Sequence, residues 1–117
     1  MAKYRHDLPM GKGKQFLLDG GLETTLVFLD GIDLPCFASY PLIAETSGRT
    51  RLRDYYRQYA NIAIKANAGF IFESVGWRAN ADWGAALGHN AEDLAAVNRE
   101  SIRLMDEIRT QIETDTS

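Results

Sequence analysis

Two short apolar runs, each ended by an acidic residue and small residues, constrain the fold of this chain most strongly. The run Gln15–Leu18 stops at an Asp-Gly-Gly sequence (19–21), and the run Phe70–Phe72 stops at a Glu-Ser pair (73–74). Brief apolar runs of this kind are typical of buried strands. Two of them separated by a helix predict a βαβ unit with parallel strands, because parallel neighbours need a crossover connection.

The rest of the pattern is helical. We expect a short helix over 22–29, an irregular apolar connection over 32–42, and an amphipathic helix that is capped by Thr46 or Ser47 and ends near Asn67-Ala68-Gly69. Asn90 is a second helix cap, and the apolar stripe after it predicts a long final helix reaching about Ile112. The order strand, helix, helix, strand, helix indicates an α/β fold. With 117 residues, the chain forms one compact domain and cannot be a complete (β/α)8 barrel, which needs roughly 250 residues.

Charge and cysteine content exclude several classes of function. The 13 Lys and Arg residues against 16 Asp and Glu give a net charge of −3, which is the wrong sign for a nucleic-acid-binding domain. No apolar run approaches the roughly 20 residues that a membrane span requires. Cys36 is the single cysteine, so an intrachain disulfide is excluded and a reducing, cytoplasmic location is expected.

The first candidate site follows the first predicted strand. In parallel α/β folds, ligands bind at the carboxyl ends of the strands. Asp19 provides a carboxylate there that can pair with the ammonium group of an amino acid, while Gly20 and Gly21 let a ligand approach the backbone. The alternative is structural: Asp19 caps the following helix and the glycines turn the chain.

The second candidate site follows the second predicted strand. Glu73 and Ser74 offer polar groups to a substrate, and Trp77 can form a pocket wall. The structural alternative is an ion pair between Glu73 and Arg78 under an aromatic lid. The lone thiol of Cys36 lies among apolar residues and is expected to be inert, and no metal site is expected from the chain's two histidines, which lie far apart.

Together these segments resemble a known family. The stretch Phe16–Leu26 resembles the opening strand and turn of the homocysteine S-methyltransferases, in which an apolar strand is followed by Asp-Gly-Gly, a hydrophobic residue and Thr-x-Leu. The segments Asp54–Gly69 and Trp77–Asn80 are similar to that family's approach to its second strand and to the loop that follows. The resemblance extends over about 15–112.

The resemblance implies a partial (β/α)8 TIM barrel made of the first two βα units with an extra helix, over residues 15–112. Residues 1–14 are then a flexible arm and residues 113–117 a frayed tail. It also implies methyl transfer to the thiol of homocysteine, in methionine synthesis, with a methyl donor as the second ligand. The implied substrate-binding residues are Asp19, Gly20, Gly21, Glu73, Ser74 and Trp77.

The resemblance implies a zinc ion that binds the homocysteine thiol in the complete family barrel and lowers its pKa. Cys36 matches none of the family's zinc cysteines, so we expect no zinc on this chain and assign it no catalytic or metal-binding residue. As a fragment, it is expected to be inactive alone. The alternative function is a non-catalytic binding or self-assembling module that pairs through exposed strand edges.

Overall fold

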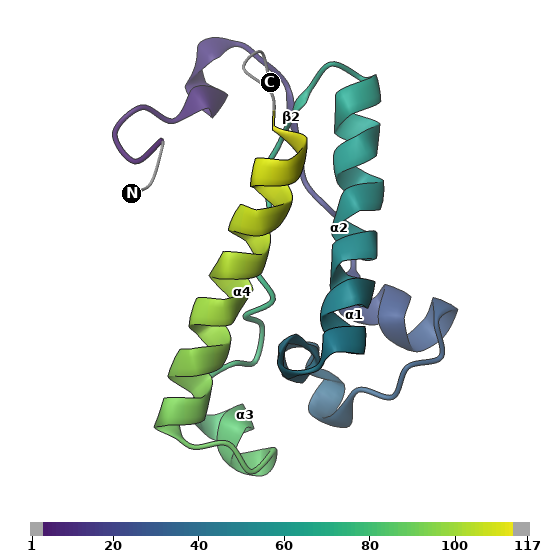
Figure 1. Cartoon of the computed structure of the whole chain (residues 1–117), viewed down its shortest axis with the longest axis vertical. Helices are drawn as coiled ribbons and strands as arrows, with labels where there is room; N and C mark the ends of the chain where they lie inside the picture. The colour runs from purple at the N-terminus through teal and green to yellow at the C-terminus, as the bar shows by residue number, and fades with distance from the viewer. Residues whose placement is uncertain (1–3, 114–117) are drawn as a thin grey trace.

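The computed structural model describes residues 4–113, and most of this part of the chain is helical. Two long helices, α2 (Thr46–Lys65) and α4 (Ala91–Ile112), lie side by side and run in the same direction (Figure 1). The shorter elements are β1 (Phe16–Leu17), α1 (Leu22–Thr24), a π-helical turn (Thr25–Leu29), 3-10 turns (Pro9–Lys12, Pro35–Phe37 and Tyr40–Ala44), β2 (Gly69–Phe70) and α3 (Ala81–Ala86).

The prediction of a partial (β/α)8 barrel is wrong. Within residues 4–113 the only sheet consists of β1 and β2, two residues each, which are paired in parallel with Phe16 opposite Gly69 and Leu17 opposite Phe70. Each strand has a partner on one side only. The apolar residues that follow each strand therefore have no further strand with which to form backbone hydrogen bonds. The chain leaves the extended conformation there. The expected parallel pairing is present, but helices, not a sheet, form the framework.

The core is built mainly by helices and turns. Helix α2 contributes Tyr55 and Tyr56, whose side chains are at most 1% exposed, and α4 contributes Ile108, which is fully buried. The connection between α1 and α2 covers the same core. The buried hydrophobic cluster comprises Leu22, Leu26, Leu34, Ala38, Tyr40, Ile43, Leu52, Tyr55, Tyr56, Val75, Leu94, Leu104, Met105 and Ile108. Burial of these side chains from both long helices explains why they stay together.

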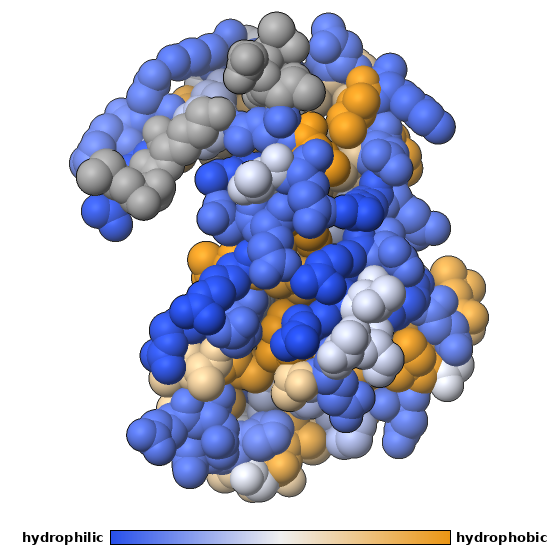
Figure 2. Space-filling model, in the orientation of Figure 1, coloured by the Kyte–Doolittle hydropathy of each residue, from blue (hydrophilic) through white to orange (hydrophobic). Residues whose placement is uncertain are grey.

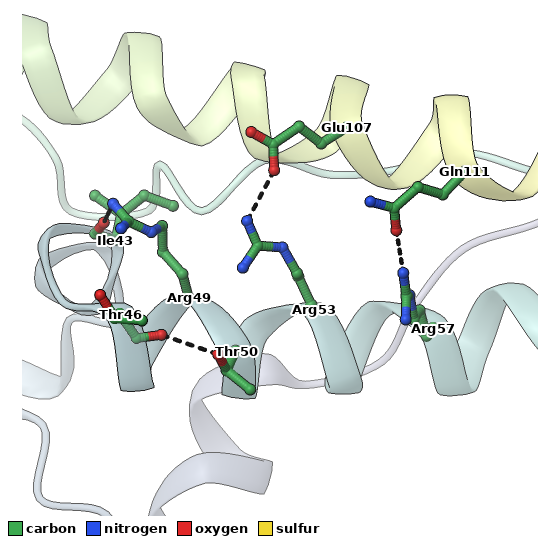
Figure 3. Close-up of polar contacts among 8 residues, drawn as sticks. All are labelled: Ile43, Thr46, Arg49, Thr50, Arg53, Arg57, Glu107 and Gln111. Carbon is green, nitrogen blue, oxygen red and sulfur yellow. Dashed lines mark hydrogen bonds and ion pairs between the residues drawn. The ribbon is translucent and has the colours of Figure 1, made fainter.

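Polar side chains also join the two long helices (Figure 3). Arg53 Nη2 donates to Glu107 Oε2 at 2.8 Å, and Arg57 donates to Gln111 four residues further along both helices. On the face shown in Figure 2, hydrophilic side chains cover most of α2 and α4, and hydrophobic surface shows in the seam between them. The polar contacts therefore lie over the apolar interface and fix the register of the helices.

The helix ends agree only partly with the sequence pattern. Asn90 caps α4 as predicted: its Oδ1 accepts from the backbone N–H of Asp93 at 2.9 Å, and Asp93 Oδ2 accepts from the backbone N–H of Asn90 at 3.0 Å. The predicted cap of α2 is wrong, because Thr46 is already helical and Glu45 precedes it without a side-chain cap. Helix α3, capped by Asn80, was not expected from the sequence.

The described part of the N-terminal arm contacts the far end of the chain. The hydroxyl of Tyr4 donates to Glu113 Oε1 at 2.8 Å, which places the arm beside the end of α4. Residues 1–3 of the predicted flexible arm and 114–117 of the predicted frayed tail lie outside the described residues. Across 4–113, no helix combines the length and the apolar character that a membrane crossing demands.

Candidate functional site

Asp19 follows β1 and is held by helix α2. The buried hydroxyl of Tyr55 donates to Asp19 Oδ2 at 2.9 Å. Asp19 Oδ1 accepts no hydrogen bond within residues 4–113 and is not among the fully buried atoms that lack a partner. The alternative that Asp19 caps α1 is wrong, because Gly21 occupies the cap position and no side chain caps this helix. Asp19 therefore has one oxygen fixed and one oxygen open.

The next residue, Gly20, packs closely against helix α2. A Cβ at Gly20 would lie 2.6 Å from the hydroxyl oxygen of Tyr59, so a larger residue would require the Tyr59 ring to move. Gly21, by contrast, has φ −85°, which any residue adopts. Gly20 therefore lets α2 approach the segment after β1, and this approach puts Tyr55 within reach of Asp19.

Both candidate clusters line one pocket of about 350 Å³. Of the six predicted binding residues, the pocket includes five, and Gly21 is absent from its wall. The lining residues are Asp19, Gly20, Leu22, Glu23, Thr24, Phe37, Tyr56, Glu73, Ser74, Val75 and Trp77. The volume suits a small molecule. The two strand ends are thus brought together.

The pocket is electronegative. Its lining contains the carboxylates of Asp19, Glu23 and Glu73 and no Lys, Arg or His. Burial raises the pKa of Tyr56 well above its usual value of 10.0, and the negative charges of these three carboxylates raise it further. Burial, followed by the hydrogen bond to Asp19 and its charge, raises the pKa of Tyr55 in the same direction. Such a pocket favours a cationic group.

Sequence reasoning missed several residues that shape the pocket. Glu23 projects from α1 and accepts from the hydroxyl of the buried Ser39 at 2.7 Å. The hydroxyl of Tyr56 donates to the backbone carbonyl of Glu73 at 2.7 Å and so fixes the segment after β2. In the sequence, Tyr55 and Tyr56 belong to the apolar stripe of the predicted amphipathic helix, which indicates packing and not a pocket. A signal was present, since buried tyrosine hydroxyls need hydrogen-bond partners.

The ion pair between Glu73 and Arg78, which the structural alternative requires, is absent among the ion pairs of residues 4–113. The guanidinium of Arg78 instead stacks on the rings of Trp77 and Trp83 and donates to the backbone carbonyl of Cys36. Glu73 is therefore not neutralised by Arg78, and its carboxylate contributes to the charge of the pocket.

The side chains do not fit the zinc ion that the resemblance implies. No group of three His, Cys, Asp or Glu residues within 4–113 has the spacing of a metal site. His89 Nδ1 is 2.7 Å from the hydroxyl of Tyr40, with which it shares a hydrogen bond. Thiolate ligands need several cysteines and the chain has Cys36 alone.

Comparison with protein-family models, with curated proteins and with solved structures finds no match to this chain.

Proposed function

We propose that this protein is homocysteine S-methyltransferase-like and takes part in methionine synthesis by binding homocysteine, the methyl acceptor, in the acidic pocket. The observation that carries the proposal is the convergence of Asp19 and Glu73, from two strand ends, on one small pocket without a basic side chain. The Asp-Gly-Gly motif that supplies Asp19 is also the motif that carries the family resemblance.

Asp19 is the residue that binds the ammonium group in this proposal. Its Oδ2 is held by Tyr55, so its open Oδ1 is positioned without a further loss of side-chain freedom. A charge-assisted hydrogen bond from an ammonium to a fixed carboxylate is shorter and stronger than a neutral one. Glu73 adds negative potential from the other strand end, and Trp77 closes the pocket with an apolar wall.

In this proposal, the chain binds homocysteine, and the homocysteine thiol is activated by groups outside the chain. The described residues do not fit a zinc ion that could activate the thiol. The same proposal places the protein in the cytoplasm, where a single cysteine remains reduced.

Isothermal titration with homocysteine under reducing conditions tests the proposal. The Asp19→Asn variant keeps the size of the side chain and an acceptor for Tyr55 but loses the charge, and we expect its Kd to rise about tenfold or more. Asp54→Asn, an exposed change one residue before Tyr55, is the matched control and should bind like the wild type. Equal Kd values for wild type and Asp19→Asn would reject the proposal.

A self-assembling module is the second candidate. Phe28 and Leu29 are 72% and 81% exposed, and β1 and β2 each retain one edge without a strand partner within 4–113. Exposed apolar side chains and open strand edges favour association of copies. Sedimentation equilibrium distinguishes the candidates: a dimer that is weakened by Phe28→Ser supports assembly, and a monomer at all concentrations contradicts it.

A further inference from the structure

The side chain of Arg78 contacts two tryptophan rings and a backbone carbonyl. Its guanidinium carbon lies 4.2 Å from the ring centre of Trp77 and 4.1 Å from that of Trp83. One terminal nitrogen donates to the backbone carbonyl of Cys36. The two indole rings and the carbonyl of Cys36 therefore hold the guanidinium in one position.

The charge and the edge of Arg78 are free for a ligand. No carboxylate forms an ion pair with Arg78 within residues 4–113. Nε and Nη2 of Arg78 form no hydrogen bond in this range, and neither is among the fully buried atoms that lack a hydrogen-bond partner. A guanidinium edge with free N–H groups matches the geometry of a carboxylate or a phosphate.

The backbone around Arg78 is strained. Four non-glycine residues within 4–113 have positive φ, and three of them, Cys36 (+56°), Phe37 (+56°) and Arg78 (+64°), meet here. Cys36 accepts from Arg78, and Phe37 packs edge-on against Trp77 with 6.2 Å between ring centres. Strained backbone of this kind persists only where surrounding contacts hold it, and it concentrates at binding sites.

We propose that Arg78 is an oxyanion-binding residue whose open edge binds the carboxylate or phosphate group of a small molecule. The two tryptophans and the carbonyl of Cys36 fix the guanidinium before the ligand arrives, so little side-chain entropy is lost on binding. Phe37 and Trp77 also line the acidic pocket, which puts this anion site at the pocket's border. The proposal does not depend on homocysteine binding at Asp19, because Arg78 is not part of that pocket's lining.

Tryptophan fluorescence reads this site directly, because Trp77 and Trp83 are the only tryptophans of the chain. Sodium acetate and sodium phosphate are titrated separately at constant ionic strength, with acetamide as the neutral counterpart of acetate. A saturable change with either anion and none with acetamide supports the proposal, and the effective anion identifies the group that is recognised. No saturation with either anion, or an equal response to acetamide, overturns it.

Two variants test whether Arg78 itself binds the anion. Arg78→Gln removes the charge, and Arg78→Lys keeps the charge but loses the planar fork. We expect at least a tenfold higher Kd for both. Arg103→Gln, which removes an exposed arginine on α4, should keep the wild-type Kd. Circular dichroism checks that each variant is folded. If Arg78→Gln does not fold, Arg78→Lys decides the question, and an unchanged Kd in a folded variant contradicts the proposal.

Discussion

The hydroxyl of Tyr55 donates a hydrogen bond to Asp19 Oδ2 across 2.9 Å and so links α2 to the segment that follows β1. The two residues are 36 positions apart in the sequence. Tyr55 is fully buried, whereas Asp19 lines the acidic pocket. Tyr55, a core residue, therefore fixes the orientation of the Asp19 carboxylate in the pocket. The packing of α2 and the geometry of the pocket are coupled for this reason.

A double-mutant cycle measures this coupling. Tyr55→Phe removes the donor and Asp19→Ala removes the acceptor. We expect each change to lower the free energy of unfolding by about 1–2 kcal/mol and the double variant to lose less than the sum, with a coupling of about 1 kcal/mol. Urea unfolding followed by circular dichroism gives the four free energies. Strict additivity would show that the bond contributes nothing in solution.

Stability should fall at alkaline pH because of the two buried tyrosines. Burial and the nearby carboxylates hold the pKa of Tyr55 and Tyr56 well above 10.0, the value expected in the unfolded chain. Above that pH the unfolded state releases these protons while the folded state keeps them, so the free energy of unfolding decreases as pH rises. Below pH 10 this contribution is fully present.

Urea unfolding between pH 8 and pH 11 checks the sign. The wild type should lose stability above pH 10, by up to about 1.4 kcal/mol per pH unit for each buried tyrosine. Tyr55→Phe should show a shallower decline, because one of the two groups no longer titrates. The same decline in both proteins would mean that Tyr55 does not remain protonated in the folded state.

The order of the main elements and the extent of α4 could be predicted from the sequence, and the length of the strands could not. The polar side chain of Asn90 ahead of an apolar stripe defines the start of α4, because a capping box is a local interaction. The length of β1 is not local. It depends on how many neighbouring strands are present, and within 4–113 there is one. Strand-forming residues after Leu17 consequently remain unpaired.

In the candidate pocket, too, some features could be predicted from the local sequence and others depend on contacts between distant segments. Asp19 and Glu73 stand out in the sequence because each ends an apolar run. The stacking of Arg78 on Trp83 was not predictable, since it requires the loop after β2 to turn at a positive φ and α3 to form. From charge alone, an ion pair between Arg78 and Glu73 is the simpler expectation. In the structure, the guanidinium of Arg78 forms cation–π contacts with two indole rings instead.

Two buried serines should respond in opposite ways to alanine. Ser39 is fully buried and its hydroxyl donates to Glu23 at 2.7 Å, whereas Ser101 is 1% exposed and its hydroxyl has no partner within the described chain. Ser39→Ala should lower the free energy of unfolding by about 1–2 kcal/mol. Ser101→Ala should leave it unchanged or raise it by up to about 1 kcal/mol, because an unsatisfied polar group is removed from the core.

Thermal and urea denaturation of both serine variants, run beside the wild type, provide the comparison. A clear loss of stability in Ser101→Ala would show that its hydroxyl does find a partner in solution. No loss in Ser39→Ala would show that the bond to Glu23 is dispensable.

The most direct test of the acidic pocket compares homocysteine with its deamino analogue, a mercaptobutanoate that keeps the thiol, the carboxylate and the chain length but lacks the ammonium group. Calorimetric titration of the wild type should give a Kd for the analogue about tenfold or more above that for homocysteine, because three carboxylates line the pocket without a basic partner. If the analogue binds as tightly as homocysteine, Asp19 does not recognise an ammonium group and the proposed function is wrong.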